Sequence, residues 1–118
     1  MQKLLAEAGR QGALVYISAV NWGEAVYAMW QMRGEDEARK LIKEAALMPL
    51  AILPVDQERA TRAGELKAVH GLRYADCFAA ELAMELGATL TTADQEFRKL
   101  GKKLKVDYLP GHENSARK

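Results

Sequence analysis

Cysteine is nearly absent from this sequence of 118 residues, which contains only Cys77. A single cysteine excludes an internal disulfide and fits the reducing environment of the cytosol. Cys77 is most simply interpreted as a small buried apolar residue. A chain of this length is the size of one domain and can bury enough surface to fold without covalent cross-links.

Long apolar runs are also absent. The longest, residues 45–55, is interrupted by Pro49 and Pro54 and is too short to cross a bilayer. The N-terminus has no apolar segment of the kind found in signal peptides, and Glu7 places an acid early in the chain. We therefore expect a cytoplasmic protein without a membrane-spanning segment.

A strong charge of one sign is missing as well. The formal net charge is +1, which gives no general electrostatic attraction to nucleic acid. The charge is unevenly spread, however, because residues 98–105 carry five cations and no acid. This basic stretch consists of Arg98, Lys99, Lys102, Lys103 and Lys105. It either borders a path for RNA or forms a solvated surface.

Several common catalytic patterns are not found. The sequence has no G-x-S-x-G motif, no GxGxxG motif and no Walker-type loop. His70 and His112 have no partner at metal-ligand spacing, and no pattern supports a catalytic pair of Cys77 with a histidine. His70 is expected at the C-terminus of a helix, where a cation is favoured anyway.

The sequence does contain abundant apolar residues, 49% of the total, arranged in two alternating patterns. Short runs rich in β-formers alternate with segments whose apolar residues recur at helical spacing. This alternation predicts an α/β domain with a mostly parallel sheet over residues 1–110, followed by a polar tail, 111–118. The expected strands are 13–17, 50–53, 88–91 and 104–109. The expected helices are 1–9, one from Ser18 or Asn21 up to Gly34, then 35–48, 56–70, 74–86 and 94–100.

Three acids, Glu24, Asp76 and Asp94, fall in or beside the first turns of predicted helices. A helix N-terminus favours an anion by roughly 0.3–1 kcal/mol. Helices that follow parallel strands begin at one edge of the sheet, so these acids would meet there. Their repulsion would require a counter-ion, and Mg²⁺ is a cation that binds such oxygen ligands. The pattern thus favours metal-assisted phosphodiester cleavage.

Helix capping is the alternative for two of these acids. Asn21-x-x-Glu24 matches a capping box, and Thr92-x-x-Gln95 matches a second one. Asp94 could itself be a helix cap. Each acid, taken alone, is explained equally well by a structural role.

Asp76 is less easily explained by capping. Arg73, three residues earlier, has no side-chain oxygen to accept from the N–H groups of the helix, so a capping box there is broken. Asp76 is also predicted to face the small residues Ala79, Ala80 and Ala83, which leave room for an ion or a substrate.

Four segments in order resemble the PIN domains of VapC-type toxins. They are 17–24 (ISAVNWGE), 50–56 (LAILPVD), 66–80 (LKAVHGLRYADCFAA) and 86–97 (LGATLTTADQEF). No single segment is decisive, but together they run in order over nearly the whole chain with suitable gaps.

The resemblance implies a three-layer PIN-like fold and an endoribonuclease that depends on Mg²⁺ or Mn²⁺. It also implies RNA as substrate, an antitoxin protein that blocks the site, and a homodimer. By position, Glu24, Asp76 and Asp94 correspond to the acids that hold the metal and act in catalysis. Thr92 corresponds to a hydroxyl that supports the site, and Asn21 to a polar residue at its entrance.

Two departures from the family pattern affect these expectations. The family usually has serine where this chain has Arg73. The family also opens with a central strand that ends in an aspartate, whereas the first residues here resemble the helix that follows that strand. We therefore expect a sheet without this strand, open edges beside 14–17 that pair with another chain, and weak RNA cleavage. Glu96 is the one nearby acid that could substitute, although a surface position explains it more simply.

Two other functions remain open at this point. The chain could be a PIN-like protein that has lost catalysis and acts by binding or oligomerisation. It could also be an unrelated α/β interaction module whose acids only cap helices. Metal titration separates the last alternative from the others, and RNA cleavage separates the first two.

Overall fold

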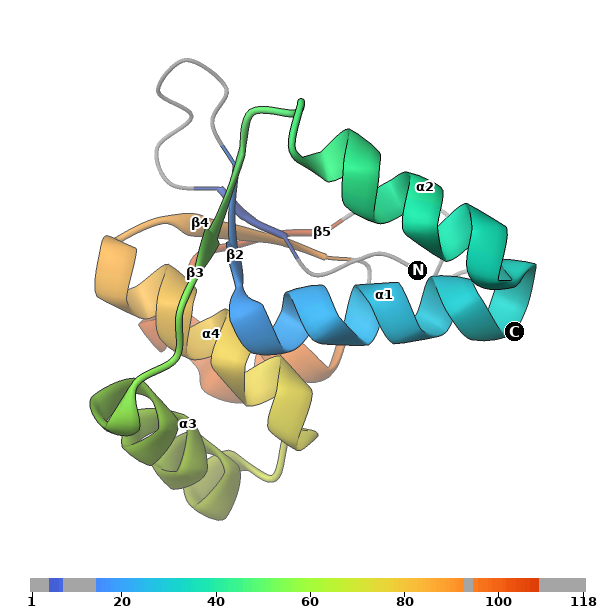
Figure 1. Ribbon diagram of the computed structural model, residues 1–118. Helices are drawn as coiled ribbons and strands as arrows, with labels where there is room; N and C mark the ends of the chain where they lie inside the picture. Colours follow the sequence, from blue (N-terminus) through green and yellow to red (C-terminus); the bar gives the residue numbers. More distant parts are fainter. Residues whose placement is uncertain (1–4, 8–14, 93–94, 109–118) are drawn as a thin grey trace.

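The computed structural model describes residues 5–7, 15–92 and 95–108. Within these residues, one sheet has the strand order β3-β2-β1-β4-β5 (Figure 1). The predicted α/β class is confirmed. The strands are β1 (Leu5–Glu7), β2 (Val15–Ser18), β3 (Leu50–Leu53), β4 (Thr89–Thr92) and β5 (Val106–Tyr108). The helices are α1 (Ala19–Arg33), α2 (Glu35–Ala45), α3 (Gln57–His70), α4 (Tyr74–Leu86) and the 3₁₀ helix η2 (Gln95–Lys103).

The centre of the sheet differs from the prediction. β1 lies between β2 and β4 and is antiparallel to both, with Ala6 opposite Tyr16 on one side and Leu90 on the other. The helix predicted over residues 1–9 is therefore wrong for Leu5–Glu7, which form a strand. The central position of the sheet, which we expected to be empty, is occupied by β1. Because β1 pairs with both of its neighbours, the open edge that we expected beside residues 14–17 is closed in the described sheet.

The other four strands point in one direction. β2 is parallel to β3, β4 is parallel to β5, and β2 and β4 share a direction because both are antiparallel to β1. Their carboxyl ends therefore lie at one edge of the sheet, which we call the rim. Ser18 ends β2 and Thr92 ends β4 at this rim.

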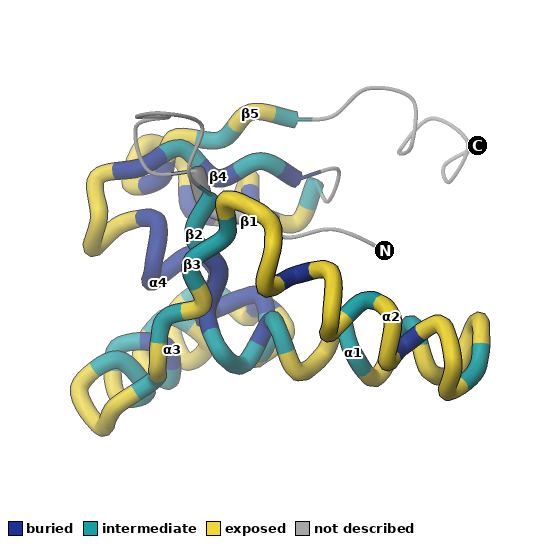
Figure 2. The backbone as a smooth tube through the Cα atoms, turned by 45° about the horizontal axis from the view of Figure 1, so that its top comes forward, coloured by how far each residue is buried: buried dark blue, intermediate teal, exposed yellow. Residues whose placement is uncertain are grey.

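Helix α4 supplies much of the core. Its residues 76–83 are all buried, and it packs against β1, β2 and β4 on one side and α3 on another (Figure 2). Ala79, Ala80 and Ala83 are at most 2% exposed, as small side chains allow a helix to lie close to a sheet. The core is completed by Leu72, Leu90, Phe97 and Leu100.

Turn and cap residues account for the agreement between predicted and observed boundaries. The Asp56 carboxylate accepts from the backbone N–H of Arg59 and caps α3, as expected. Gly71 and Gly87 end α3 and α4 in the left-handed conformation that glycine adopts without strain. The bounds of β3 and α4 match the prediction, and η2 runs three residues further than expected, past a break at Gly101.

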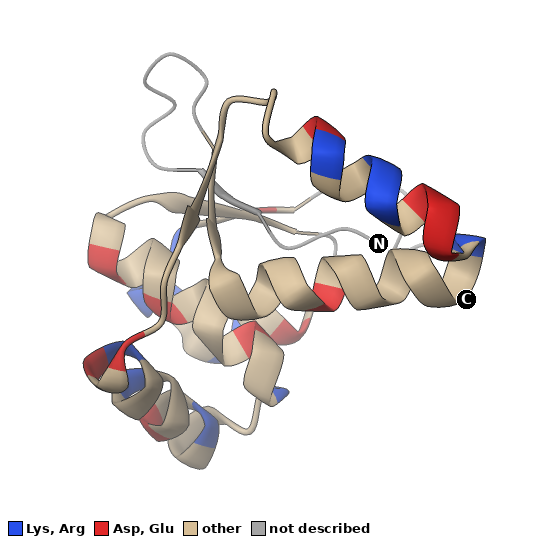
Figure 3. Cartoon of the chain, viewed as in Figure 1, with Lys and Arg blue, Asp and Glu red and all other residues tan. Residues whose placement is uncertain are grey.

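Helices α1 and α2 form a hairpin that packs on itself and extends from the domain (Figure 1). Charged residues cover α2, whereas α1 carries few (Figure 3). Several large apolar side chains on this hairpin are exposed, including Tyr27 (65%), Met32 (68%) and Ile42 (41%). None of the helices in the described ranges is long and apolar enough to span a bilayer.

Candidate active site

Asp76 is the acid that the structure places most distinctively. It lies in the first turn of α4 and is only 1% exposed. The N-cap of its helix is Arg73, which makes no side-chain capping bond, so a capping box is absent there, as expected. A carboxylate buried at a helix N-terminus is stabilised by the backbone N–H dipoles there, but burial of its charge still demands a positive partner.

Arg73 supplies that partner. Its Nε lies 3.1 Å from Asp76 Oδ2 and its Nη2 lies 3.3 Å from Oδ1, so the guanidinium contacts both carboxylate oxygens. The arginine side chain is 71% exposed, whereas Asp76 is buried. Sequence reasoning treated Arg73 only as an unsuitable cap and missed this ion pair, although the i,i+3 spacing of opposite charges was a usable signal.

Asn21 connects the start of α1 to the start of α4. It is 3% exposed, and its Nδ2 donates to the carbonyl of Ala75, the residue before Asp76, over 2.9 Å. Its Oδ1 is buried and has no hydrogen-bond partner within the described part of the chain. Buried acceptors are nearly always satisfied, so this oxygen, on a side chain tied to the turn that contains Asp76, is an unused donor for a ligand.

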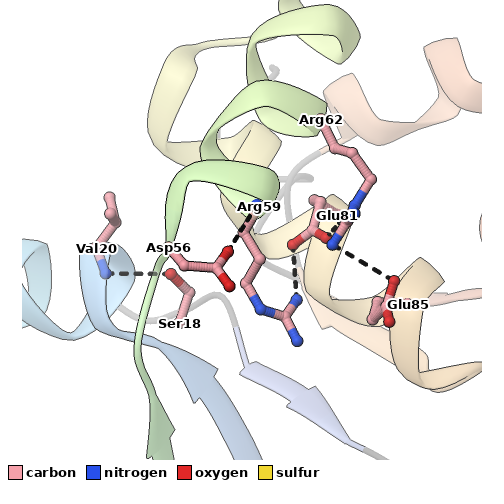
Figure 4. A network of polar contacts seen from close by, with 7 residues as sticks. All are labelled: Ser18, Val20, Asp56, Arg59, Arg62, Glu81 and Glu85. Carbon is pink, nitrogen blue, oxygen red and sulfur yellow. Dashed lines mark hydrogen bonds and ion pairs between the residues drawn. The ribbon is translucent and has the colours of Figure 1, made fainter.

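The capping-box interpretation of Asn21 and Glu24 is wrong. The N-cap of α1 is Ser18, whose hydroxyl accepts from the N–H of Val20 over 3.1 Å (Figure 4). Asn21 is therefore already inside the helix. Glu24 lies one turn further along α1 and is exposed. Residues three apart on a helix are neighbours, which places Glu24 near Asn21 but at the surface.

The remaining predicted site residues are placed less completely. Thr92 is 1% exposed and ends β4 at the rim, opposite Tyr108 of β5. Asp94 lies outside the described residues, as do His112 and the tail 111–118. Glu96 is exposed and pairs with Lys99 over 3.0 Å. In the described ranges, no three His, Cys, Asp or Glu residues gather closely enough to hold a metal ion. Among the predicted site residues in the described ranges, Asn21 is the one that a hydrogen bond joins to the turn that contains Asp76.

The basic stretch lies on η2 and the turn after it. Arg98 lies over the ring of Tyr108, 4.4 Å from its centroid, and also bonds the side chain of Gln95. Lys99 Nζ lies 4.0 Å from where a Cβ on Gly71 would be, beside the turn that leads into α4. Lys102 and Lys103 are exposed.

Cys77 follows Asp76 but is fully buried, as predicted, with its Sγ 3.9 Å from the carbonyl of Leu72. Burial raises the pKa of this thiol, the negative charge of Asp76 adds to the rise, and Lys67 opposes it. The reactive thiolate is therefore disfavoured, which excludes Cys77 as an activated nucleophile.

A second buried acid was missed by the sequence analysis. Glu81 of α4 is 4% exposed and accepts from Arg59 over 2.9 Å and Arg62 over 2.8 Å, while Arg62 also reaches Glu85 over 3.5 Å (Figure 4). Its position beside Arg62 keeps the pKa of that guanidinium above the ordinary value. Because both partners come from α3, we assign Glu81 to the packing of α3 on α4 and not to the active site.

A comparison with protein-family models matches residues 2–103 to the PIN domain. The chain belongs to the PIN domain family. This membership agrees with the short parallel strands and flanking helices of the fold, and it indicates a nuclease-type function that acts on nucleic acid. PIN domains generally use divalent metal ions. A comparison with curated proteins found no match.

The residues of this PIN domain fit a divalent cation. The Asp76 carboxylate and the unsatisfied Asn21 Oδ1 are oxygen donors, the type that Mg²⁺ and Mn²⁺ prefer. One feature opposes the ion: the guanidinium of Arg73 already contacts both oxygens of Asp76.

Proposed function

We propose that this PIN domain is an endoribonuclease of the VapC toxin type that depends on Mg²⁺ or Mn²⁺. The observation that carries the proposal is the bond that ties Asn21, whose amide oxygen is unsatisfied, to the carbonyl of Ala75, the residue before the buried Asp76. A bound divalent ion would activate water and neutralise charge on the phosphodiester.

Each predicted site residue has a role in this proposal. Asp76 and Asn21 hold the ion from the starts of α4 and α1. Glu24 and Asp94 add carboxylates at the entrance, and the Thr92 hydroxyl supports the site from the end of β4. The burial of Asn21, Asp76 and Thr92 supports these roles because buried side chains keep a fixed geometry and exclude water.

The test is cleavage of single-stranded RNA with Mg²⁺ or Mn²⁺ and with a chelator. We expect cleavage that requires metal and that Asp76→Asn reduces by about 100-fold or more, since catalytic groups act as a unit. Asp36→Asn on α2 is the matched control, because Asp36 also lies in the first turn of a helix but is exposed and distant in the sequence. Cleavage that survives in the chelator or in Asp76→Asn would refute the proposal.

The toxin assignment rests on the four segments that resemble VapC proteins. An antitoxin requires a docking surface, and the exposed Tyr27, Met32 and Ile42 of the α1–α2 hairpin provide apolar area for one. Expression of the chain should slow the growth of bacterial cells, and Asp76→Asn should relieve that effect. Equal growth with both chains would contradict the toxin role.

A homodimer in a cytoplasmic setting is part of the same proposal. Because the centre of the described sheet is closed, open strand edges no longer favour a dimer. The support for a dimer is the exposed apolar side chains of the hairpin. Sedimentation should show a dimer at micromolar concentration, and a monomer there would contradict it.

A second candidate function has one specific observation in its favour. If Arg73 holds Asp76 permanently, the domain would bind nucleic acid or protein without cleaving it. Binding of RNA without cleavage in either metal would favour this alternative.

A further inference from the structure

The ion pair between Arg73 and Asp76 has a pronounced asymmetry of burial. Asp76 is 1% exposed, and the helical residues that follow it, up to Ala83, are all buried, so its carboxylate is held in place. The Arg73 side chain is 71% exposed and lies at the end of the helix. If the pair separates, the arginine is the partner that moves, because it can rotate into solvent while Asp76 cannot.

The contact also engages the whole carboxylate. Nε meets Oδ2 and Nη2 meets Oδ1, so neither oxygen is left outside the pair. A guanidinium and a divalent cation are both positive and both approach a carboxylate through these oxygens. They cannot occupy the same side of Asp76 at close range without strong repulsion.

The position of Arg73 makes this contact depend on Asp76. Arg73 is the N-cap of α4, where the helix dipole disfavours a cation. The negative charge of Asp76 offsets this effect and favours the guanidinium at that position. A metal ion that neutralised Asp76 would weaken the attraction between this carboxylate and the guanidinium.

We propose that Arg73 is a built-in counter-ion that occupies the Asp76 carboxylate until a divalent cation displaces it. The inference rests on the proposed metal dependence of this site. It makes Arg73 a regulator of metal affinity, which stabilises the metal-free protein and raises the concentration of metal that the site requires. The buried Asn21 Oδ1, which a guanidinium on Asp76 does not satisfy, remains for the incoming ion.

The test is Mn²⁺ binding, measured by electron paramagnetic resonance on the full chain without RNA. Arg73→Ser should bind Mn²⁺ about tenfold more tightly than the unmodified chain, since a charge-assisted hydrogen-bond pair no longer competes. Arg39→Ser is the matched control. Arg39 is 63% exposed and pairs with Glu35 over 2.8 Å on α2, so it loses a similar surface contact away from the site. Its Mn²⁺ affinity should be unchanged.

Thermal unfolding without metal supplies a second measurement. Arg73→Ser should lower the melting temperature because the buried Asp76 carboxylate loses the guanidinium that contacts both of its oxygens, and saturating Mn²⁺ should restore it. The double variant Arg73→Ser with Asp76→Asn should show neither the tighter binding nor the metal-dependent recovery.

The outcomes distinguish this inference from the function on which it rests. If Asp76→Asn abolishes Mn²⁺ binding but Arg73→Ser leaves the affinity unchanged or lower, the counter-ion role is wrong and the metal site stands. If neither the unmodified chain nor Arg73→Ser binds Mn²⁺ through Asp76, both proposals are wrong. Tighter binding in Arg73→Ser that Asp76→Asn abolishes supports both.

Discussion

At the scale of single residues, the site is built from side chains that do two things at once. Asn21 joins two helices through its nitrogen and presents its oxygen to the space beside them. Asp76 is buried as a core residue would be, yet it carries a charge that needs a partner. Such arrangements are costly for folding, and proteins retain them where function requires them.

The bond from Asn21 to the Ala75 carbonyl allows a first prediction. Asn21→Ala should lower the free energy of unfolding by about 0.5–1.5 kcal/mol, because it removes the hydrogen bond that joins the start of α1 to the start of α4. Gln31→Ala is the matched control, since Gln31 is an exposed amide on the same helix and should change stability little. Urea unfolding measures both. Equal stability of the two variants would show that the bond contributes nothing.

A second prediction follows from the raised pKa of Cys77. Burial raises it, so in the interval above the ordinary value of 9.0 the unfolded chain loses this proton while the folded chain keeps it. The folded state then binds more protons than the unfolded state, and stability falls as pH rises through that interval. The contribution is fully present below pH 9 and is lost at higher pH.

The measurement is the free energy of unfolding between pH 8 and about 10 for the unmodified chain and Cys77→Ala. Cys77→Ala leaves a small cavity and is less stable throughout, so the slope with pH is the relevant quantity. The unmodified chain should show the steeper decline. Identical slopes would mean that the buried thiol titrates as it does in the unfolded chain.

At the scale of helices and strands, left-handed glycines separate the elements that position the site. Gly71 has a φ of 72° and joins α3 to the segment that contains Arg73 and Asp76. Gly64 lies inside α3, and a Cβ there would meet no atom within 4 Å. A side chain at Gly71 would therefore be strained, whereas a side chain at Gly64 would fit.

The third prediction compares these two positions. Gly71→Ala should destabilise the domain by about 1–2 kcal/mol because an L-residue is strained at that φ. Gly64→Ala should stabilise it by about 0.5–1 kcal/mol because alanine favours a helix over glycine. Thermal unfolding of the two variants measures the difference. A loss of stability in both would mean that α3 tolerates no added side chain.

Sequence reasoning worked best where such local signals exist. Pro49 and Pro54 delimit β3, and Gly71 and Gly87 delimit the segment that contains α4, so these bounds were predictable. Leu5–Glu7 carries too few residues to show strand alternation. Its hydrogen bonds go to β2 and β4, one of them more than 80 residues away, as Ala6 pairs with Leu90. No local sequence pattern predicts a pairing partner that lies so far away along the chain.

The site was predictable to a similar extent. The helix entrances and the motif resemblance pointed to Asn21, Asp76 and Thr92, which are all buried at or near the rim. The bond from Asn21 to Ala75 spans 54 positions and depends on how α1 and α4 pack. The predicted roles of Glu24 and Asp94 stay predictions.

At the scale of the whole molecule, the near-neutral charge makes local surfaces decisive for RNA binding. A net charge of +1 attracts RNA weakly, so any affinity must come from a concentrated patch. Within the basic stretch, Arg98 is engaged by Tyr108 and Lys99 by Glu96. Lys102 and Lys103 are exposed, which makes them the clearest test of the patch.

The fourth prediction is that Lys102→Glu with Lys103→Glu weakens binding of single-stranded RNA at low salt. Two lost phosphate contacts should also reduce the salt dependence, with the slope of log K against log salt falling by about 1.4. Lys40→Glu with Lys43→Glu makes the same change of net charge on α2 and is the matched control. Because α2 lies on the outer hairpin, this control should weaken binding only through the overall charge.

Fluorescence anisotropy without metal measures binding apart from cleavage. If both double variants bind equally well at every salt concentration, net charge alone governs affinity, and the basic stretch is an ordinary solvated surface. A loss confined to Lys102 and Lys103 would place the RNA path along η2, on the side of the domain where Lys99 approaches the turn before Asp76.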